Sequence, residues 1–252
     1  MRKARISYDG AIHEAIDWQD RLKLDDGRIV EEKDVVWLTP IVPRTVFALG
    51  LNYADHAAEL AFAAPSEPLV FLKGPNTFIG HQGSTRRPAD VTYMHYECEL
   101  AVIIGKTARN VKKKNAYNYI KGYSVANDYA IRDYLENYYR PNLRVKNRDS
   151  CTPFGPWLVE AADVANPMDL KLTTHVNDEL VQQGTTKDMI FDIATLIEYL
   201  SSFMTLSEND VILTGTPKGS VDTVVGDVVI TEVEGIGRLI NTIIGDESFT
   251  NR

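Results

Sequence analysis

The stretch MHYECELAVIIGK, residues 94–106, joins two neighbouring glutamates to a run of apolar residues. The apolar run predicts a buried β-strand over residues 98–105. Because successive side chains of a strand point to opposite faces, Glu97 and Glu99 project together while Cys98 and Leu100 point the other way. Two carboxylates side by side repel each other, and a hard divalent cation relieves that repulsion. The alternative is that both glutamates face water.

Asp128 is the third carboxylate of interest. It lies in NDYAIRDYL, residues 127–135, where a strand is expected to lead into a helix. Together with Glu97 and Glu99 it would offer oxygen ligands to one Mg²⁺ or Mn²⁺, a ligand set that such ions favour over zinc. The alternative is that Asp128 caps the helix.

The composition is that of an ordinary globular protein, with 44% hydrophobic and 25% charged residues among 252. The formal net charge of −8 argues against nucleic acid as a partner, since binding phosphates requires a basic surface. No apolar run is long enough for a bilayer, and the N-terminus lacks a hydrophobic signal core, so a cytoplasmic protein without membrane attachment is expected. Cys98 and Cys151 show no CxxC spacing and are predicted to be free thiols.

Residues 1–43 are expected to form a small N-terminal β region, with hairpin turns at Asp9-Gly10 and around Asp25-Asp26-Gly27. The catalytic domain is predicted over residues 44–252. Its strands are expected at 45–53, 69–73, 98–105, 122–130, 155–159, 170–177, 210–215, 227–234 and 237–245, and its helices at 55–62, 115–120, 131–138 and 192–206. Because strands dominate and do not alternate regularly with helices, an α+β, mainly β fold is predicted rather than a doubly wound parallel sheet.

A potential proton-transfer pair occurs in NYADHAAEL, residues 52–60, which places His56 and Glu59 three residues apart. On a helix this spacing puts both side chains on one face. A carboxylate in that position can orient an imidazole that moves protons or activates water. The alternative is an exposed ion pair on a surface helix.

Several cations could bind an anionic substrate. Lys73 ends an apolar strand just before Gly-Pro, where its side chain could reach into a cleft. Arg144, Lys146 and Arg148 alternate along the chain and would share one face if their segment is extended. Such a row can bind carboxylates or protect a sheet edge.

Three further residues are candidates for contact with a ligand. Arg132 lies one predicted helical turn after Asp128, and Tyr139 could line a cleft, although aromatic residues at this spacing more often pack in a core. Thr216 lies in LTGTPKG, residues 213–219, a loop whose backbone N–H groups and hydroxyl could receive a carboxylate.

Taken together, the order of GLNYADHAAE, FLKGPNTF, MHYECELAVIIGK, NDYAIRDYL, VNDELVQQGTTKDMIF, LTGTPKG and EVEGIGRLIN is distinctive. It resembles the fumarylacetoacetate hydrolase family from residue 44 to the end. The resemblance implies a β-rich fold that works as a homodimer and holds Mg²⁺ or Mn²⁺ through three carboxylates, which correspond to Glu97, Glu99 and Asp128. It also places His56 and Glu59 in a mobile lid, Lys73 and Lys146 at the substrate, and Gln183 and Thr216 where they position a substrate carboxylate or water.

Within the family, DYAIRDYLENYYRPNLRVK and LVQQGTT are most similar to a group of homoprotocatechuate catabolism. Members of that group decarboxylate 5-oxopent-3-ene-1,2,5-tricarboxylate and isomerise 2-hydroxyhepta-2,4-diene-1,7-dioate. The implied substrate is a small polycarboxylic 2-oxo acid. Some members are fused double-length chains and others are separate halves, so a paralogous partner subunit is an alternative to the homodimer.

Two other functions remain open. One is a different reaction on the same fold: C–C hydrolysis of fumarylpyruvate or an acylpyruvate, or decarboxylation or tautomerisation of oxaloacetate. The other is a non-catalytic subunit that only binds a paralogous half. Lys218 occupies a position where acylpyruvate hydrolases of the family often have alanine, which argues against that reaction.

The predicted site residues have two kinds of role, catalytic and substrate-binding. His56, Glu59 and Lys146 are expected to be catalytic, and proton transfer is assigned either to His56 with Glu59 or to a lysine. The predicted substrate-binding residues share polar or charged side chains and are Lys73, Arg132, Tyr139, Gln183 and Thr216.

Overall fold

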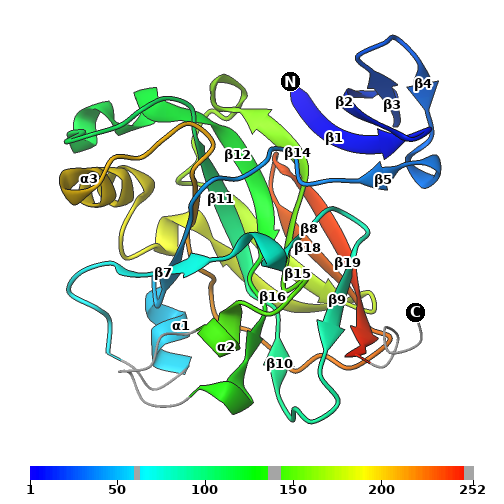
Figure 1. Ribbon diagram of the computed structural model, residues 1–252. Coiled ribbons are helices and arrows are strands. Elements are labelled where there is room, and N and C mark those ends of the chain that lie inside the picture. The colour runs from blue at the N-terminus through cyan, green and yellow to red at the C-terminus, as the bar shows by residue number, and fades with distance from the viewer. Residues whose placement is uncertain (60–62, 136–142, 247–252) are drawn as a thin grey trace.

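The computed structural model describes residues 1–59, 63–135 and 143–246. Strands predominate over helices, which confirms the predicted α+β, mainly β class (Figure 1). The first strands lie at one end of the molecule, and helices α1 (Ala54–Glu59), α2 (Leu143–Lys146) and α3 (Ile193–Phe203) lie toward the other.

The larger sheet spans the molecule. In spatial order its strands are β4 (Ile29–Val30), β3 (Arg21–Leu24), β2 (Ala11–Trp18), β1 (Arg2–Tyr8), β14 (Thr152–Glu160), β12 (Ile120–Asn127), β11 (Cys98–Ile104), β17 (Val211–Leu213), β6 (Val46–Gly50) and β7 (Leu69–Lys73). Two short strands join it from the side, β5 (Val36–Trp37) on β1 and β8 (Phe78–Ile79) on β14.

Two smaller sheets complete the strand pairing. The first has the order β16 (Glu179–Thr185), β15 (Lys171–Val176), β18 (Val228–Val233), β19 (Gly237–Gly245) and β9 (Ser84–Arg87). The second pairs β10 (Met94–His95) with β13 (Ala130–Ile131). Short 3₁₀ helices connect the strands: η1 (Glu32–Asp34), η2 (Pro75–Thr77), η3 (Lys113–Tyr119), η4 (Arg132–Tyr134), η5 (Ala161–Asp163) and η6 (Thr186–Asp188).

Strand β11 forms the centre of the core and is buried along its whole length. On one face, Cys98 and Leu100 belong to a large apolar cluster that includes Leu172 on β15 of the five-stranded sheet. On the other face, Ala101 and Ile103 belong to a separate cluster. A strand covered on both faces reads as a continuous apolar run, which is why residues 98–105 stand out in the sequence.

Helix α3 follows the spacing that the sequence predicts. Its buried residues include Ile193, Leu196, Ile197 and Leu200. Asp192 caps the N-terminus by accepting a hydrogen bond from the Thr195 backbone N–H at 2.7 Å. None of the helices in the described ranges is long and apolar enough to cross a membrane.

The N-terminal strands continue the large sheet, because β1 pairs with β14 at Arg2↔Val159 and Lys3↔Leu158. The predicted hairpin turn at Asp9-Gly10 is confirmed, and both residues have positive φ, as a tight two-residue turn requires. Whether residues 1–43 form a separate domain stays a prediction.

The helix predicted over 131–138 is wrong at its beginning. Ala130 and Ile131 pair with His95 and Met94 as strand β13, and Arg132–Tyr134 form a single 3₁₀ turn. The strand pairing satisfies the backbone groups that a helix would have used, and Arg132 donates its N–H to the Tyr93 carbonyl. Residues 136–138 lie outside the described part of the chain.

The stability of the fold should depend on pH through His81. Its Nδ1 accepts the Ile240 backbone N–H at 3.1 Å, and burial together with Arg238 lowers the pKa of His81 to about 4. Between pH 6.5 and pH 4 this histidine is protonated in the unfolded chain but not in the folded one. The free energy of unfolding therefore falls by about 3 kcal/mol as the pH drops from 6.5 to 4.

The His81→Asn variant should lose this part of the pH dependence, since asparagine keeps an acceptor for Ile240 but does not titrate. Urea unfolding measured across this pH window checks the prediction. An equal pH slope in the variant and the wild type would contradict it.

Candidate active site and metal centre

The pairing of β11 with β12 brings the three predicted carboxylates together. Cys98 is opposite Asn127, so the residues next to them, Glu97 and Asp128, also lie opposite each other. The Asp128 N–H donates to the Glu97 carbonyl at 2.9 Å. One ligand oxygen from each of Glu97, Glu99 and Asp128 lies within 4.8 Å of the others, and all three residues are buried.

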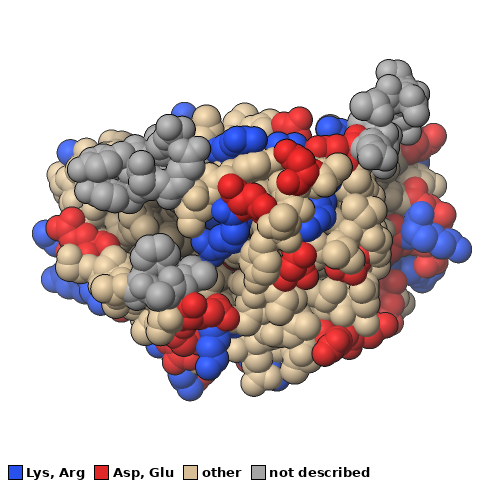
Figure 2. All heavy atoms as spheres, turned by 90° about the horizontal axis from the view of Figure 1, so that it is seen from below, with Lys and Arg blue, Asp and Glu red and all other residues tan. Residues whose placement is uncertain are grey.

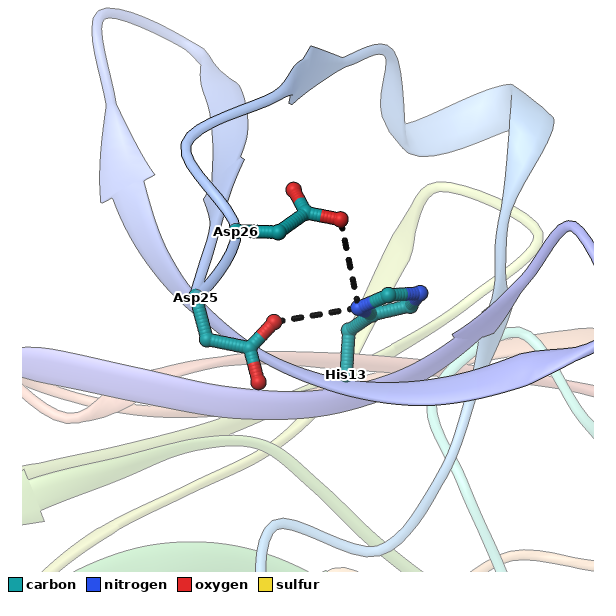
Figure 3. Close-up of side chains that lie close together, drawn as sticks. All are labelled: His13, Asp25 and Asp26. Carbon is teal, nitrogen blue, oxygen red and sulfur yellow. Dashed lines mark hydrogen bonds and ion pairs between the residues drawn. The ribbon is translucent and has the colours of Figure 1, made fainter.

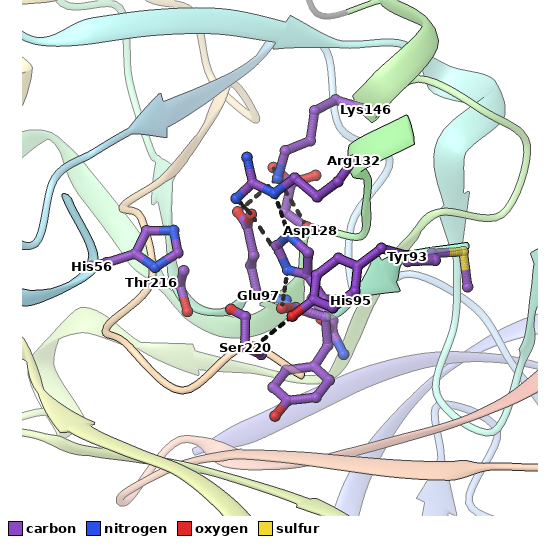
Figure 4. A network of polar contacts seen from close by, with 12 residues as sticks. His56, Tyr93, His95, Glu97, Asp128, Arg132, Lys146, Thr216 and Ser220 are labelled. Atoms are coloured by element: carbon purple, nitrogen blue, oxygen red, sulfur yellow. Dashed lines mark hydrogen bonds and ion pairs between the residues drawn. The ribbon is translucent and has the colours of Figure 1, made fainter. Parts of the chain in front are cut away.

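Two lysines lie against this carboxylate cluster. Lys146 on α2 donates to Glu97 Oε2 at 2.6 Å, and its Nζ is 3.0 Å from Asp128 Oδ2 (Figure 4). Lys73 donates to Asp128 Oδ1 at 2.5 Å and to the Lys146 carbonyl, and its side chain is fully buried. These contacts make Lys73 a counter-ion of Asp128. Its predicted role in substrate binding stays a prediction.

The carboxylate cluster has unused ligand atoms. Glu99 Oε1 and Asp128 Oδ2 are buried and accept no hydrogen bond; the Lys146–Asp128 Oδ2 contact is an ion pair without hydrogen-bond geometry. Buried carboxylate oxygens without partners are costly unless a cation binds them. Oxygen-only ligands also match the preference of Mg²⁺ and Mn²⁺, so the residues fit such an ion.

Ionisation differs strongly within the carboxylate cluster. Burial disfavours charge on Glu97, but the ammonium of Lys146 outweighs it and lowers the pKa of Glu97 to about 2. For Glu99, burial and the charges of Asp128 and Glu97 raise the pKa well above its ordinary value. The two glutamates therefore differ in how readily they ionise. Binding a cation has to compensate the cost of ionising Glu99.

The turn after β17 supports Glu99 from the backbone. Gly215 donates its N–H to Glu99 Oε2 at 2.6 Å. Gly215 has a φ of +89°, and a Cβ there would lie 2.9 Å from the Asn52 Cβ. Glycine is therefore required where the LTGTPKG loop passes over the carboxylate.

His56 and Glu59 lie together on α1, as predicted. His56 Nδ1 is 3.0 Å from Glu59 Oε2, and His56 is buried. Glu59 Oε1 accepts the Gly219 N–H at 3.1 Å, which ties α1 to the LTGTPKG loop. A carboxylate on Nδ1 leaves Nε2 as the ring atom for proton transfer.

Thr216 lies in the same region but is held by a residue that the sequence did not single out. Gln182 donates from Nε2 to Thr216 Oγ1 at 3.0 Å and to the Pro217 carbonyl at 2.8 Å. Gln183, the predicted residue, is exposed, as expected for its neighbour on an alternating strand. No sequence signal distinguishes the two glutamines. The predicted roles of Gln183 and Thr216 stay predictions.

Arg132 lies at the edge of the carboxylate cluster beside His95. Its Nε donates to His95 Nε2 at 2.8 Å, and its Nη2 is 4.0 Å from Glu97 Oε1. Burial lowers the pKa of His95 to about 4. His95 was missed in the sequence, although it precedes Glu97 by two residues and so shares its face of an extended segment.

Two alternatives that the sequence left open for the surrounding residues do not hold. Asp128 caps no helix, because β13 follows it. Arg144, Lys146 and Arg148 share no extended face, since residues 143–146 are helical: the Arg144 guanidinium lies 3.8 Å from the Tyr134 ring centroid, and Arg148 pairs with Asp246. Tyr139 lies outside the described residues.

Comparison with known proteins agrees with this geometry. A model of the fumarylacetoacetate (FAA) hydrolase C-terminal family matches residues 45–244. The chain belongs to the fumarylacetoacetate hydrolase family. The matched range includes the whole carboxylate cluster and the His56–Glu59 pair, so both are parts of the fumarylacetoacetate hydrolase domain.

Several relatives of this family are closely similar. The chain is 62% identical, over 81% of its length and 48% of the relative's, to the 4-hydroxyphenylacetate degradation bifunctional isomerase/decarboxylase of Salmonella dublin. It spans about half the length of the curated bifunctional relatives that it matches.

Solved structures of the family cover the chain almost completely. The 5-carboxymethyl-2-hydroxymuconate delta-isomerase of Mycobacterium smegmatis is 37% identical with a TM-score of 0.86, covering 98% of this chain and 99% of that one. The 2-hydroxyhepta-2,4-diene-1,7-dioate isomerase of Mycobacterium marinum is 33% identical with a TM-score of 0.84 and the same coverage.

A second group of potential metal ligands lies outside the fumarylacetoacetate hydrolase domain. His13 Nδ1 is 3.0 Å from Asp25 Oδ1 and 3.9 Å from Asp26 Oδ2, so both carboxylates face one ring nitrogen (Figure 3). Arg28 already binds both Asp26 and His13 Nε2. This group therefore lacks the unused buried oxygens of the carboxylate cluster.

Charge is mixed on the face of the molecule seen in Figure 2. Lys and Arg side chains lie interspersed with Asp and Glu rather than in a continuous basic area. On this face, positive charge therefore comes from individually placed cations rather than from a basic patch.

Proposed function

We propose that the chain is a metal-dependent decarboxylase and isomerase of 2-oxo and 2-hydroxydienoic polycarboxylates in homoprotocatechuate breakdown. The observation that carries the proposal is the 62% identity to a bifunctional isomerase/decarboxylase, in a chain whose buried carboxylates converge within 4.8 Å. The named substrates are 5-oxopent-3-ene-1,2,5-tricarboxylate for decarboxylation and 2-hydroxyhepta-2,4-diene-1,7-dioate for isomerisation.

Glu97, Glu99 and Asp128 would hold Mg²⁺ or Mn²⁺. The chemistry that such an ion supplies is Lewis-acid stabilisation of negative charge on a carbonyl oxygen, which both loss of CO₂ and tautomerisation require. Lys146 and Lys73 are counter-ions of Glu97 and Asp128 and hold these two carboxylates in place. The protein thereby supplies one electrostatic environment for both reactions.

Proton transfer falls to His56, oriented by Glu59. We expect His56→Gln to lower kcat about 10²-fold or more, the usual contribution of a general acid or base, with unchanged Mg²⁺ affinity. Steady-state kinetics and calorimetric titration with Mg²⁺ measure the two quantities. Near-normal turnover in the variant would assign the proton to another residue, Lys146 being the other predicted catalytic group.

The direct test is incubation with the tricarboxylate, with and without Mg²⁺, followed by mass spectrometry. We expect CO₂ loss with Mg²⁺ or Mn²⁺, and activity at background level after chelation with EDTA that returns when either ion is added back. Turnover that persists in EDTA would rule out the metal-dependent function.

Hydrolysis of a C–C bond is a second candidate, favoured by the His56–Glu59 pair, because a carboxylate-oriented imidazole can also activate water. Incubation with fumarylpyruvate in place of the tricarboxylate, followed by mass spectrometry, distinguishes hydrolysis from decarboxylation. Hydrolysis yields two acids, whereas decarboxylation yields one acid and CO₂.

The assembly is also part of the proposal, which favours a cytoplasmic homodimer. Since the chain spans about half of its bifunctional relatives, pairing with a paralogous half is the alternative. Native mass measurement of active protein distinguishes them. An inactive isolated chain that gains activity with a paralogous half would support the second arrangement.

A further inference from the structure

His95 is buried beside the carboxylate cluster, and its hydrogen bonds define one tautomer. Nδ1 is 3.0 Å from the Tyr96 carbonyl, which can only accept, so Nδ1 carries the proton. Nε2 is 2.8 Å from Arg132 Nε, which can only donate, so Nε2 carries none. His95 is therefore a neutral ring whose one lone pair is directed at Arg132.

This contact limits the orientation of the Arg132 guanidinium. The group is planar, so a fixed Nε–H direction also fixes the plane of both Nη atoms. The backbone holds the residue as well, because the Arg132 N–H donates to the Tyr93 carbonyl at 3.0 Å. Arg132 thus reaches the cluster as a rigid fork rather than a mobile cation.

The Nη edge of the guanidinium has no hydrogen-bond partner within the described part of the chain. Neither Nη atom donates a hydrogen bond to any residue in the described ranges, and the side chain is 23% exposed. Glu97 lies 4.0 Å from Nη2, beyond hydrogen-bond distance, and is already bound by Lys146 at 2.6 Å. Neutralising Glu97 is therefore not the main use of Arg132.

We propose that His95 is a positioning residue that holds Arg132 to bind a distal carboxylate of the substrate. The pair would select 2-oxo acids that carry a second carboxylate far from the oxo group. A guanidinium held through Nε presents its two Nη–H groups in the geometry that a carboxylate accepts. The inference rests on the proposed function, since the carboxylate cluster must bind the 2-oxo end of the same molecule.

The test compares two ligands of equal length, 2-oxoheptanedioate and 2-oxoheptanoate, by calorimetric titration of the Mg²⁺-loaded protein. They differ only in the terminal carboxylate. We expect the wild type to bind the dioate about tenfold or more tighter, as a charge-assisted hydrogen-bonded pair allows. In His95→Leu the ratio of the two affinities, dioate over monocarboxylate, should fall close to one, because only the affinity for the dioate decreases.

Rescue and control variants separate positioning from folding. His95→Gln should keep most of the ratio, because its Oε1 can accept from Arg132 Nε. In Arg132→Leu the affinity ratio should also fall close to one. Adding His95→Leu to that variant should not lower the affinity for the dioate any further. His81→Asn changes another buried histidine, packed on Trp37, and should leave the ratio unchanged.

The outcomes that overturn the inference differ from those that overturn the function. A ratio that survives in His95→Leu or Arg132→Leu, or equal weakening of both ligands, would refute the role of His95 alone. If neither ligand binds the wild type with Mg²⁺, the proposed function fails and this inference fails with it. Should His95→Leu not fold, the His95→Gln and Arg132→Leu variants decide the matter by the same ratio.

Discussion

Replacing Glu99 by glutamine is expected to lower Mg²⁺-dependent turnover by at least about 10³-fold, because metal-ion catalysis supplies several kcal/mol of charge stabilisation. Glu99 is fully buried, and its Oε1 accepts no hydrogen bond. The variant keeps the shape of the side chain and an oxygen for the Gly215 N–H. What it loses is the negative charge that a divalent cation needs.

The stability of the same variant should change in the opposite direction. Burial and the charges of Asp128 and Glu97 raise the pKa of Glu99, so its ionised form destabilises the metal-free protein. Glu99→Gln should therefore unfold at a temperature equal to or above that of the wild type in EDTA. Added Mg²⁺ should raise the melting temperature of the wild type only.

The surface variant Glu208→Gln is a suitable control. Glu208 is exposed and pairs with Lys121 at 3.1 Å, so neither turnover nor the response to Mg²⁺ should change. Turnover of Glu99→Gln within a few-fold of the wild type would show that the carboxylate cluster is not the metal centre.

Replacing Lys73 by methionine should destabilise the metal-free protein by about 3 kcal/mol, near the lower end of the usual cost of removing one partner of a buried ion pair, because Lys146 stays 3.0 Å from Asp128. Both side chains of the Lys73–Asp128 pair are fully buried. Lys73 also donates to the Lys146 carbonyl and contacts Cys151 Sγ at 3.5 Å, so one substitution removes several contacts. Urea unfolding in EDTA measures the loss.

Two comparisons make this prediction specific. Lys121→Met breaks an exposed ion pair and should cost at most about 1 kcal/mol. Adding Asp128→Asn to Lys73→Met should restore part of the lost stability, because the buried charge that has lost Lys73 is removed as well. A cost for Lys73→Met no larger than that for Lys121→Met would contradict the counter-ion role.

Much of the fold can be predicted from short stretches of the sequence. The apolar run of 98–105, the spacing of Ile193, Leu196 and Leu200, and the turn at Asp9-Gly10 each depend on a period or a backbone preference that spans a few residues. Where local preference competed with long-range pairing, prediction failed. Residue 131, predicted as helical, is part of a strand because β10 was available to pair with it.

The site residues likewise fall into two groups, those predicted from local spacing and those placed by contacts between distant segments. Alternation along residues 97–99 places Glu97 and Glu99 on one face in any extended conformation, and helical spacing brings His56 to Glu59. Asp128 was a candidate from its place at a predicted strand end, and the resemblance to the fumarylacetoacetate hydrolase family implied it as the third ligand. Nothing in the sequence separates Gln182 from Gln183 or assigns His95 to Arg132, because those contacts join segments far apart in the chain.

The sequence by itself therefore determined the strand-rich class, the buried central strand and which carboxylates share a face. Only the tertiary structure decided that Lys73 pairs with Asp128, that Lys146 joins Asp128 to Glu97, and that neither Nη atom of Arg132 donates to a described residue. The reason is physical: side-chain direction follows from local backbone geometry. Which charges meet depends on strand register and on how distant loops pack over the strand ends.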